Sequence, residues 1–123
     1  MKNNIEIKIK VAYLAHQSDV YASQYAYTYT MTITNKGDIG VQLLMRHWHI
    51  QDETGHTEDV IGEGVIGQQP HLASGESFQY ASGAIIRTLT GSMKGSYGMV
   101  DDHGERFNVQ IPEFILSEPY TLH

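Results

Sequence analysis

The chain has 123 residues, no cysteine and a formal net charge of −6 at pH 7, so it is the size of one domain, which we predict to span residues 1–123. The missing cysteines exclude a disulfide scaffold and a thiolate metal site, and the negative charge argues against binding to nucleic acid or to an anionic membrane surface. With no secretory signal and no apolar run near the ~18 residues needed to span a bilayer, we expect a cytoplasmic protein.

Alternation with a period of two residues dominates the chain. Residues 5–13 alternate aliphatic with charged side chains, and residues 25–34 alternate large apolar side chains with alanine and threonine. Both patterns are typical of half-buried β-strands. Five more strands are expected at residues 41–52, 56–61, 76–86, 91–101 and 106–116. No segment of ten or more residues carries a helical apolar stripe, so the sequence predicts an all-β fold.

The predicted turns separate these strands. The segments 52–55 (DETG) and 101–104 (DDHG) each place an aspartate three residues before a glycine, which predicts two hairpin loops. Pro112 predicts an edge position or a bulge for the last strand, because proline cannot donate a ladder hydrogen bond. We therefore predict a β-sandwich of about seven antiparallel strands, of the immunoglobulin or fibronectin type III kind. Its Trp48 would pack in the core without a disulfide partner.

Residues 62–70, GEGVIGQQP, contain the letters G-x-G-x-x-G. In a dinucleotide-binding fold these glycines open a helix whose N-terminus holds a phosphate. Here Pro70 and Gly75 follow too closely for a helix, no phosphate-binding lysine is present, and Glu63 would repel an anion. We interpret the segment as a connection that crosses from one sheet to the other. An anion-binding nest of backbone N–H groups without a helix is the alternative.

His47 and His49 lie on the same face of one predicted strand. A metal site would need a third ligand at a suitable spacing, and no such spacing is present, so we interpret the pair as an exposed polar face. No set of residues matches a nucleophile elbow, and the sequence predicts no catalytic residue and no cofactor.

Residues 41–50, 58–86 and 91–116 together resemble the bacterial ApaG family, and the likeness extends from about Ile5 to the end of the chain. The resemblance implies a fibronectin type III-like sandwich in a small cytoplasmic protein without established enzymatic activity. It also implies an association with cobalt and magnesium resistance or efflux. The residues that match family positions are Gly62, Gly64, Gly67, Gln69, Pro70, Gly75, Glu76, Tyr80, Ser82, Gly83, Arg46 and Trp48. Ser74 departs from the family pattern, where many members have proline.

Two functions follow as hypotheses. The first is a non-catalytic module that binds a protein partner through the loop from Gly62 to Pro70, flanked by Arg46 and Tyr80. The second is binding of a pyrophosphate-containing nucleotide, such as diadenosine tetraphosphate, by the loop N–H groups with Arg46 or Arg87 supplying charge. The candidate binding residues are Gly62, Glu63, Gly64, Gly67, Gln69, Pro70, Arg46, Tyr80 and Ser82. Direct metal binding by His47, His49 and neighbouring carboxylates ranks below both, and a homodimer that covers a strand edge is a further prediction.

Overall fold

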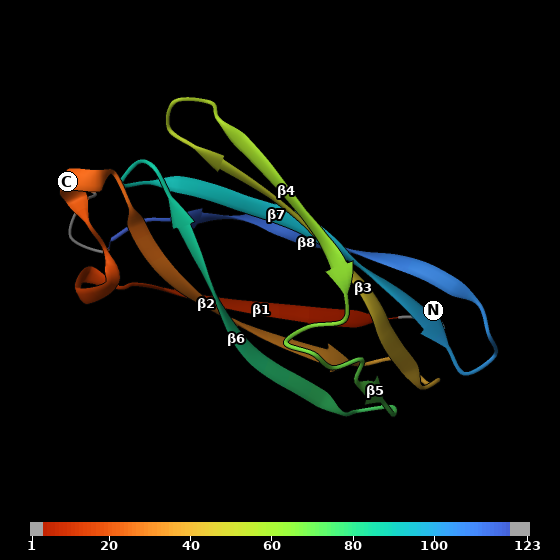
Figure 1. Cartoon of the computed structure of the whole chain (residues 1–123). Helices are drawn as coiled ribbons and strands as arrows, with labels where there is room; N and C mark the ends of the chain where they lie inside the picture. The colour runs from red at the N-terminus through yellow and green to blue at the C-terminus, as the bar shows by residue number, and fades with distance from the viewer. Residues whose placement is uncertain (1–3, 119–123) are drawn as a thin grey trace.

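The computed structural model describes residues 4–118 and consists of two antiparallel β-sheets packed face to face (Figure 1). One sheet has the order β1-β2-β6, formed by Ile5–Tyr13, Tyr25–Asn35 and Ser77–Ile86. The other has the order β4-β3-β7-β8, formed by Thr57–Glu63, Val41–Asp52, Gly91–Asp101 and Arg106–Leu116. The two-residue strand β5, His71–Leu72, pairs with the start of β3. The predicted all-β sandwich is confirmed.

All seven predicted strands are present, and β5 is the addition. The fourth long strand, β4, joins β3 and not the sheet of β1 and β2, which is the fibronectin type III arrangement and differs from constant-type immunoglobulin domains. Two 3₁₀ helices, Ala15–Gln17 and Val20–Ala22, connect β1 to β2. Within residues 4–118, no helix is long and apolar enough to cross a membrane.

The core lies between the sheets and follows the predicted alternation. Tyr27, Tyr29, Met31 and Ile33 of β2 all point inward and are buried. Trp48 of β3 faces them, with its ring centroid 5.2 Å from that of Tyr29. Such ring pairs stabilise a core by about 1 kcal/mol each beyond their buried area. The tryptophan therefore packs among aromatic rings, as predicted, without a disulfide.

Pro112 lies at an edge and in a bulge, as predicted. Its strand, β8, is the last in the five-stranded sheet, and in the described part of the chain it pairs only with β7. The register shifts between Met93, which faces Phe114, and Gly95, which faces Ile111, so Pro112 falls in the irregular stretch. The proline therefore interrupts no regular ladder.

The first predicted hairpin loop joins β3 to β4 at residues 52–56. Oδ1 of Asp52 accepts hydrogen bonds from the N–H groups of Thr54 and His56, at 2.8 and 3.1 Å, and from the Thr54 hydroxyl at 2.7 Å. Gly55 adopts a φ of 89°, in the left-handed region that glycine enters at little cost. The aspartate thus holds the turn backbone, as the sequence indicated.

The second predicted hairpin loop joins β7 to β8 at residues 101–105 and repeats this construction. Oδ1 of Asp101 accepts hydrogen bonds from the N–H groups of His103 and Glu105, at 2.9 and 3.0 Å. Gly104 has a φ of 84°. Because β3 and β7 are antiparallel neighbours, the two loops lie at opposite ends of the sheet.

Candidate functional site

The glycine-rich segment after β4 forms a tight turn. Val65 and Gln68 bond to each other in both directions, with N···O distances of 2.8 and 2.9 Å. Ile66 and Gly67 occupy the centre of this turn with φ values of 43° and 77°. Positive φ at both central positions is the mark of a type I′ turn. Isoleucine is strained in this conformation, because its β-branched side chain crowds the backbone.

Gly64 and Gly62 have separate steric roles. Gly64 has a φ of 62°, and a Cβ there would lie 2.2 Å from the carbonyl oxygen of Gln68. Its N–H donates to the carbonyl of Leu44 at 2.8 Å. At Gly62 a Cβ would lie 2.8 Å from the guanidinium of Arg46. The glycines are therefore explained by the turn and by close packing, without reference to a phosphate.

This turn carries the chain out of the five-stranded sheet, through β5, and into β6 of the other sheet (Figure 1). From Gly67 to residue 118 the chain contains no helix. The interpretation of the segment as a crossing between sheets is confirmed. The N–H groups of Gly64 and Val65 already donate to carbonyl groups, so they are not free to form an anion-binding nest.

Arg46 fixes the entry to the turn. Its Nη1 donates to the carbonyl oxygens of Glu63 and Gly64, both at 3.0 Å. The carboxylate of Glu63 is not part of this contact. Because the guanidinium lies against Gly62, a side chain at this position would displace it from the two carbonyl oxygens. Arg46 therefore holds the loop in place from β3, while its positive charge stays near the surface.

Gln69 and Pro70 attach the far side of the loop to β3. The side chain of Gln69 donates to the carbonyl of Leu44 at 3.0 Å. The carbonyl of Pro70 accepts from the N–H of Leu43, also at 3.0 Å. With Arg46 on one side and these two bonds on the other, the turn between them is held firmly on the edge of the sheet.

Tyr80 and Ser82 lie on β6, and Tyr80 is turned away from the surface. The Tyr80 hydroxyl lies 2.6 Å from that of Tyr97 in the core. Burial raises the pKa of Tyr80 to about 12 and also raises the pKa of Tyr97. Ser82 is half-buried beside Tyr29, in a cavity that Arg46 also lines. The structure thus brings Arg46 and Ser82 together and leaves the Tyr80 ring inaccessible to a partner.

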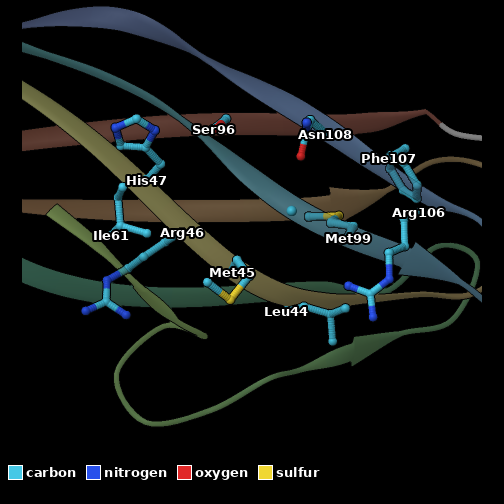
Figure 2. Close-up of a pocket in the computed structure, with 11 residues that line it drawn as sticks. Leu44, Met45, Arg46, His47, Ile61, Ser96, Met99, Arg106, Phe107 and Asn108 are labelled. Carbon is cyan, nitrogen blue, oxygen red and sulfur yellow. The ribbon is translucent and has the colours of Figure 1, made fainter. Parts of the chain in front are cut away.

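A groove of about 330 Å³ runs over the outer face of the five-stranded sheet, next to the turn (Figure 2). Its apolar residues are Leu44, Met45, Ile61, Met99 and Phe107, and its polar residues include Arg46, His47, Ser96, Arg106 and Asn108. Met45 and Ile61 are 38% and 67% exposed. An exposed apolar surface with a polar border is the anatomy of a protein-binding surface.

His47 and His49 share one partner that sequence analysis did not identify. Oδ1 of Asp59 on β4 lies 2.9 Å from Nε2 of His47 and 3.1 Å from Nδ1 of His49. The two imidazoles, His47 first, hold the pKa of Asp59 below its usual value. In the part of the chain from residue 4 to 118, no group of three or more His, Cys, Asp or Glu is arranged to hold a metal ion.

The sequence pattern pointed one residue away from Asp59. Counting outward from the predicted turn at residues 52–55 pairs His49 with Glu58, whereas the observed loop has five residues, 52–56, and pairs His49 with Asp59. The exposed Ile61 and Ile66 gave no signal of their own, because alternation alone does not distinguish an apolar residue that faces the core from one that faces solvent.

Comparison with known proteins gives consistent results. The family model described as the ApaG domain matches residues 15–101. A protein named ApaG from Nitrosomonas eutropha is 50% identical over 122 residues, covering 99% of this chain and 96% of that protein. A protein of the same name from Thiobacillus denitrificans is 47% identical over the same length and shares of both chains. The crystal structure of the putative ApaA protein from Bordetella pertussis superposes with a TM-score of 0.94 at 41% identity, covering 97% of each chain.

Proposed function

The chain belongs to the ApaG domain family, and from this premise we propose that it is a non-catalytic module that binds a protein partner. The partner docks on the turn Val65–Gln68 and on the adjoining groove of the outer sheet face. The family membership and the sandwich by themselves do not identify a function, so the proposal depends on the surface.

The proposal rests mainly on the conformation and exposure of Ile66. It is 54% exposed at the centre of the turn, and it adopts the left-handed conformation that costs an L-residue about 1–2 kcal/mol. Because more than half of the residue is exposed to solvent, burial offsets only part of this cost. Strain that is retained at an exposed apolar residue points to a binding role.

The free edge of β4 adds a second contact. Within residues 4–118, β4 pairs only with β3, so the backbone groups along its outer side have no strand beside them. Ile61 projects from this strand into the groove (Figure 2). A partner strand added along β4 would place its side chains against Ile61 and Met45.

A substitution at Ile66 separates binding from stability. Asparagine tolerates the left-handed conformation, so Ile66→Asn is expected to raise the free energy of unfolding by about 1 kcal/mol. The same change removes the apolar contact and should weaken partner binding about 30-fold, as expected for a central apolar contact worth about 2 kcal/mol.

Affinity capture from the native lysate, with quantification by mass spectrometry, tests this expectation. The matched control is Ile115→Asn, which alters an isoleucine of similar exposure, 58%, on the opposite edge strand β8. We expect a protein that the wild type and Ile115→Asn capture equally and that Ile66→Asn loses. If no protein is enriched, or if the two variants behave alike, the proposal is wrong.

Nucleotide binding is the alternative prediction, and one observation favours it: Arg46 and Arg106 both line the groove and offer charge to a pyrophosphate. The engaged N–H groups of Gly64 and Val65 weaken it. Isothermal titration with diadenosine tetraphosphate, with and without magnesium, decides the question, because no heat at millimolar ligand would end this alternative. The cytoplasmic location, the homodimer and the association with cobalt and magnesium resistance stay predictions.

A further inference from the structure

The carboxylate of Asp52 has two oxygens in different situations. Oδ1 is saturated by the backbone and hydroxyl donors of Thr54 and by the N–H of His56. Oδ2 is buried, since the side chain is only 3% exposed, and it has no hydrogen-bond donor among residues 4–118. A carboxylate oxygen accepts about two hydrogen bonds, and leaving it without one when buried is costly.

One cation approaches this oxygen without binding it. Nε of Arg87 lies 3.6 Å from Oδ2, beyond the range of an N–H···O hydrogen bond, and the Arg87 side chain is 61% exposed. An ion pair with such an exposed partner is weak and is screened by salt. Arg87 therefore shows that a guanidinium can reach Asp52, but it leaves Oδ2 unsatisfied.

A cavity of about 190 Å³ opens in front of these two side chains, between β3, β4 and β6. Ile50, Ile85 and Ile86 line it, and so does the carboxylate side chain of Glu58. Apolar walls with a buried acid suit a ligand that has an aliphatic stem and a cationic end. A guanidinium is more weakly hydrated than an ammonium and costs less to bring into such a site.

We propose that this cavity binds the side chain of an arginine from a partner polypeptide, whose guanidinium donates to Oδ2 of Asp52 while Arg87 moves into solvent. The aliphatic part of the bound side chain packs on Ile50 and Ile85, and Glu58 adds a second negative charge. This site is separate from the turn and groove of the proposed function, so either proposal can fail without the other.

Asp101 provides an internal control. Its Oδ2 is also buried without a hydrogen bond, but no cationic side chain of residues 4–118 forms an ion pair with it, and it lines none of the cavities described above. A buried, unsatisfied carboxylate oxygen is therefore common to both hairpins. The cavity and the nearby arginine distinguish Asp52.

The test uses two small probes and four proteins. The probes are N-acetyl-arginine amide and its uncharged isostere N-acetyl-citrulline amide. The proteins are the wild type, Arg87→Ala, and Arg87→Ala combined with either Asp52→Asn or Asp101→Asn. Asparagine keeps the Oδ1 acceptor that holds each hairpin and removes the charge. Affinity is measured by calorimetry, and folding of every variant is checked by circular dichroism.

Because Arg87 competes for the site, Arg87→Ala should bind the arginine probe several-fold more tightly than the wild type does, and at least tenfold more tightly than the citrulline probe. Adding Asp52→Asn should remove this preference, and adding Asp101→Asn should leave it intact. If Arg87→Ala binds the two probes with equal affinity, the proposal is wrong. This comparison needs neither double variant, so it holds even if one of them does not fold. A separate experiment with agmatine, a small amine that carries the guanidinium without peptide groups, tests the source of the ligand. If agmatine binds more than tenfold more tightly than the arginine probe, a polypeptide arginine is excluded.

Discussion

The hairpin loops 52–56 and 101–105 are built alike and lie in different surroundings. Each begins with a buried aspartate whose Oδ1 holds the turn backbone, and each ends its tight bend with a glycine at positive φ. Among residues 4–118, the aspartate of the first loop pairs with an arginine and lines one of the cavities described above, whereas Asp101 does neither. The aspartate therefore holds the turn in both places, and the adjoining surface decides whether it can also bind a ligand.

Removing the aspartate carboxylate of either loop should cause the largest loss of stability. Asp101→Ala leaves two loop N–H groups without their acceptor and should lower the free energy of unfolding by about 2 kcal/mol. Asp52→Ala should cost more, because Asp52 accepts three hydrogen bonds and also faces Arg87. Urea denaturation of both variants measures the difference. Equal losses, or a larger loss at Asp101, would show that the third hydrogen bond and Arg87 add no stability to the first loop.

Replacing the glycine of either loop should lower stability by a smaller amount, equal in the two loops. Gly55 and Gly104 have φ values of 89° and 84°, and a Cβ at either position would meet no atom within 4 Å. Gly55→Ala and Gly104→Ala therefore add only backbone strain, about 1 kcal/mol each. Thermal unfolding of the two variants checks this expectation. Losses that differ by more than about 0.5 kcal/mol would reveal a contact that one loop has and the other lacks.

Protonation of Asp52 in acid should give the smallest effect on stability. The Thr54 hydroxyl, followed by backbone N–H groups and Arg87, holds the pKa of Asp52 below its usual value. The folded state therefore favours the ionised form, so this contribution to stability is present at neutral pH. It is lost as the pH falls below the usual aspartate value of about 4 and through the lowered folded-state pKa.

The effect is small because the protonated group can still accept hydrogen bonds through its carbonyl oxygen. Unfolding free energies of the wild type and Asp52→Asn, measured from pH 7 to pH 3, isolate it. The wild type should lose more stability than the variant over this range. Parallel curves would mean that Asp52 does not contribute to the pH dependence of stability.

Much of the fold followed from local chemistry. The alternation in residues 5–13 and 25–34, the D-x-x-G turns and Pro112 predicted strands, hairpins and an edge, because each depends on a few neighbouring residues. The glycine segment was also interpreted correctly as a crossing. The acceptor of the Gly64 N–H could not be predicted, because it is the carbonyl of Leu44 in another strand.

The candidate sites were less predictable, for a physical reason. The Arg87–Asp52 contact joins the end of β3 to a residue 35 positions later, just after β6 of the other sheet. The direction of the Arg46 guanidinium depends on the shape of the loop above it. Such contacts arise from how the two layers pack, which alternation and turn patterns do not specify. The strain at Ile66 likewise became visible only with its backbone angle.

One NMR titration tests the difference between the two hairpins within a single sample. N-acetyl-arginine amide is added to the ¹⁵N-labelled wild-type protein, and the amide signals of Thr54 and His56 are compared with those of His103 and Glu105. We expect progressive, saturable shifts at Thr54 and His56 and stationary signals at His103 and Glu105. Stationary signals in both loops, or equal shifts in both, would contradict arginine binding beside Asp52.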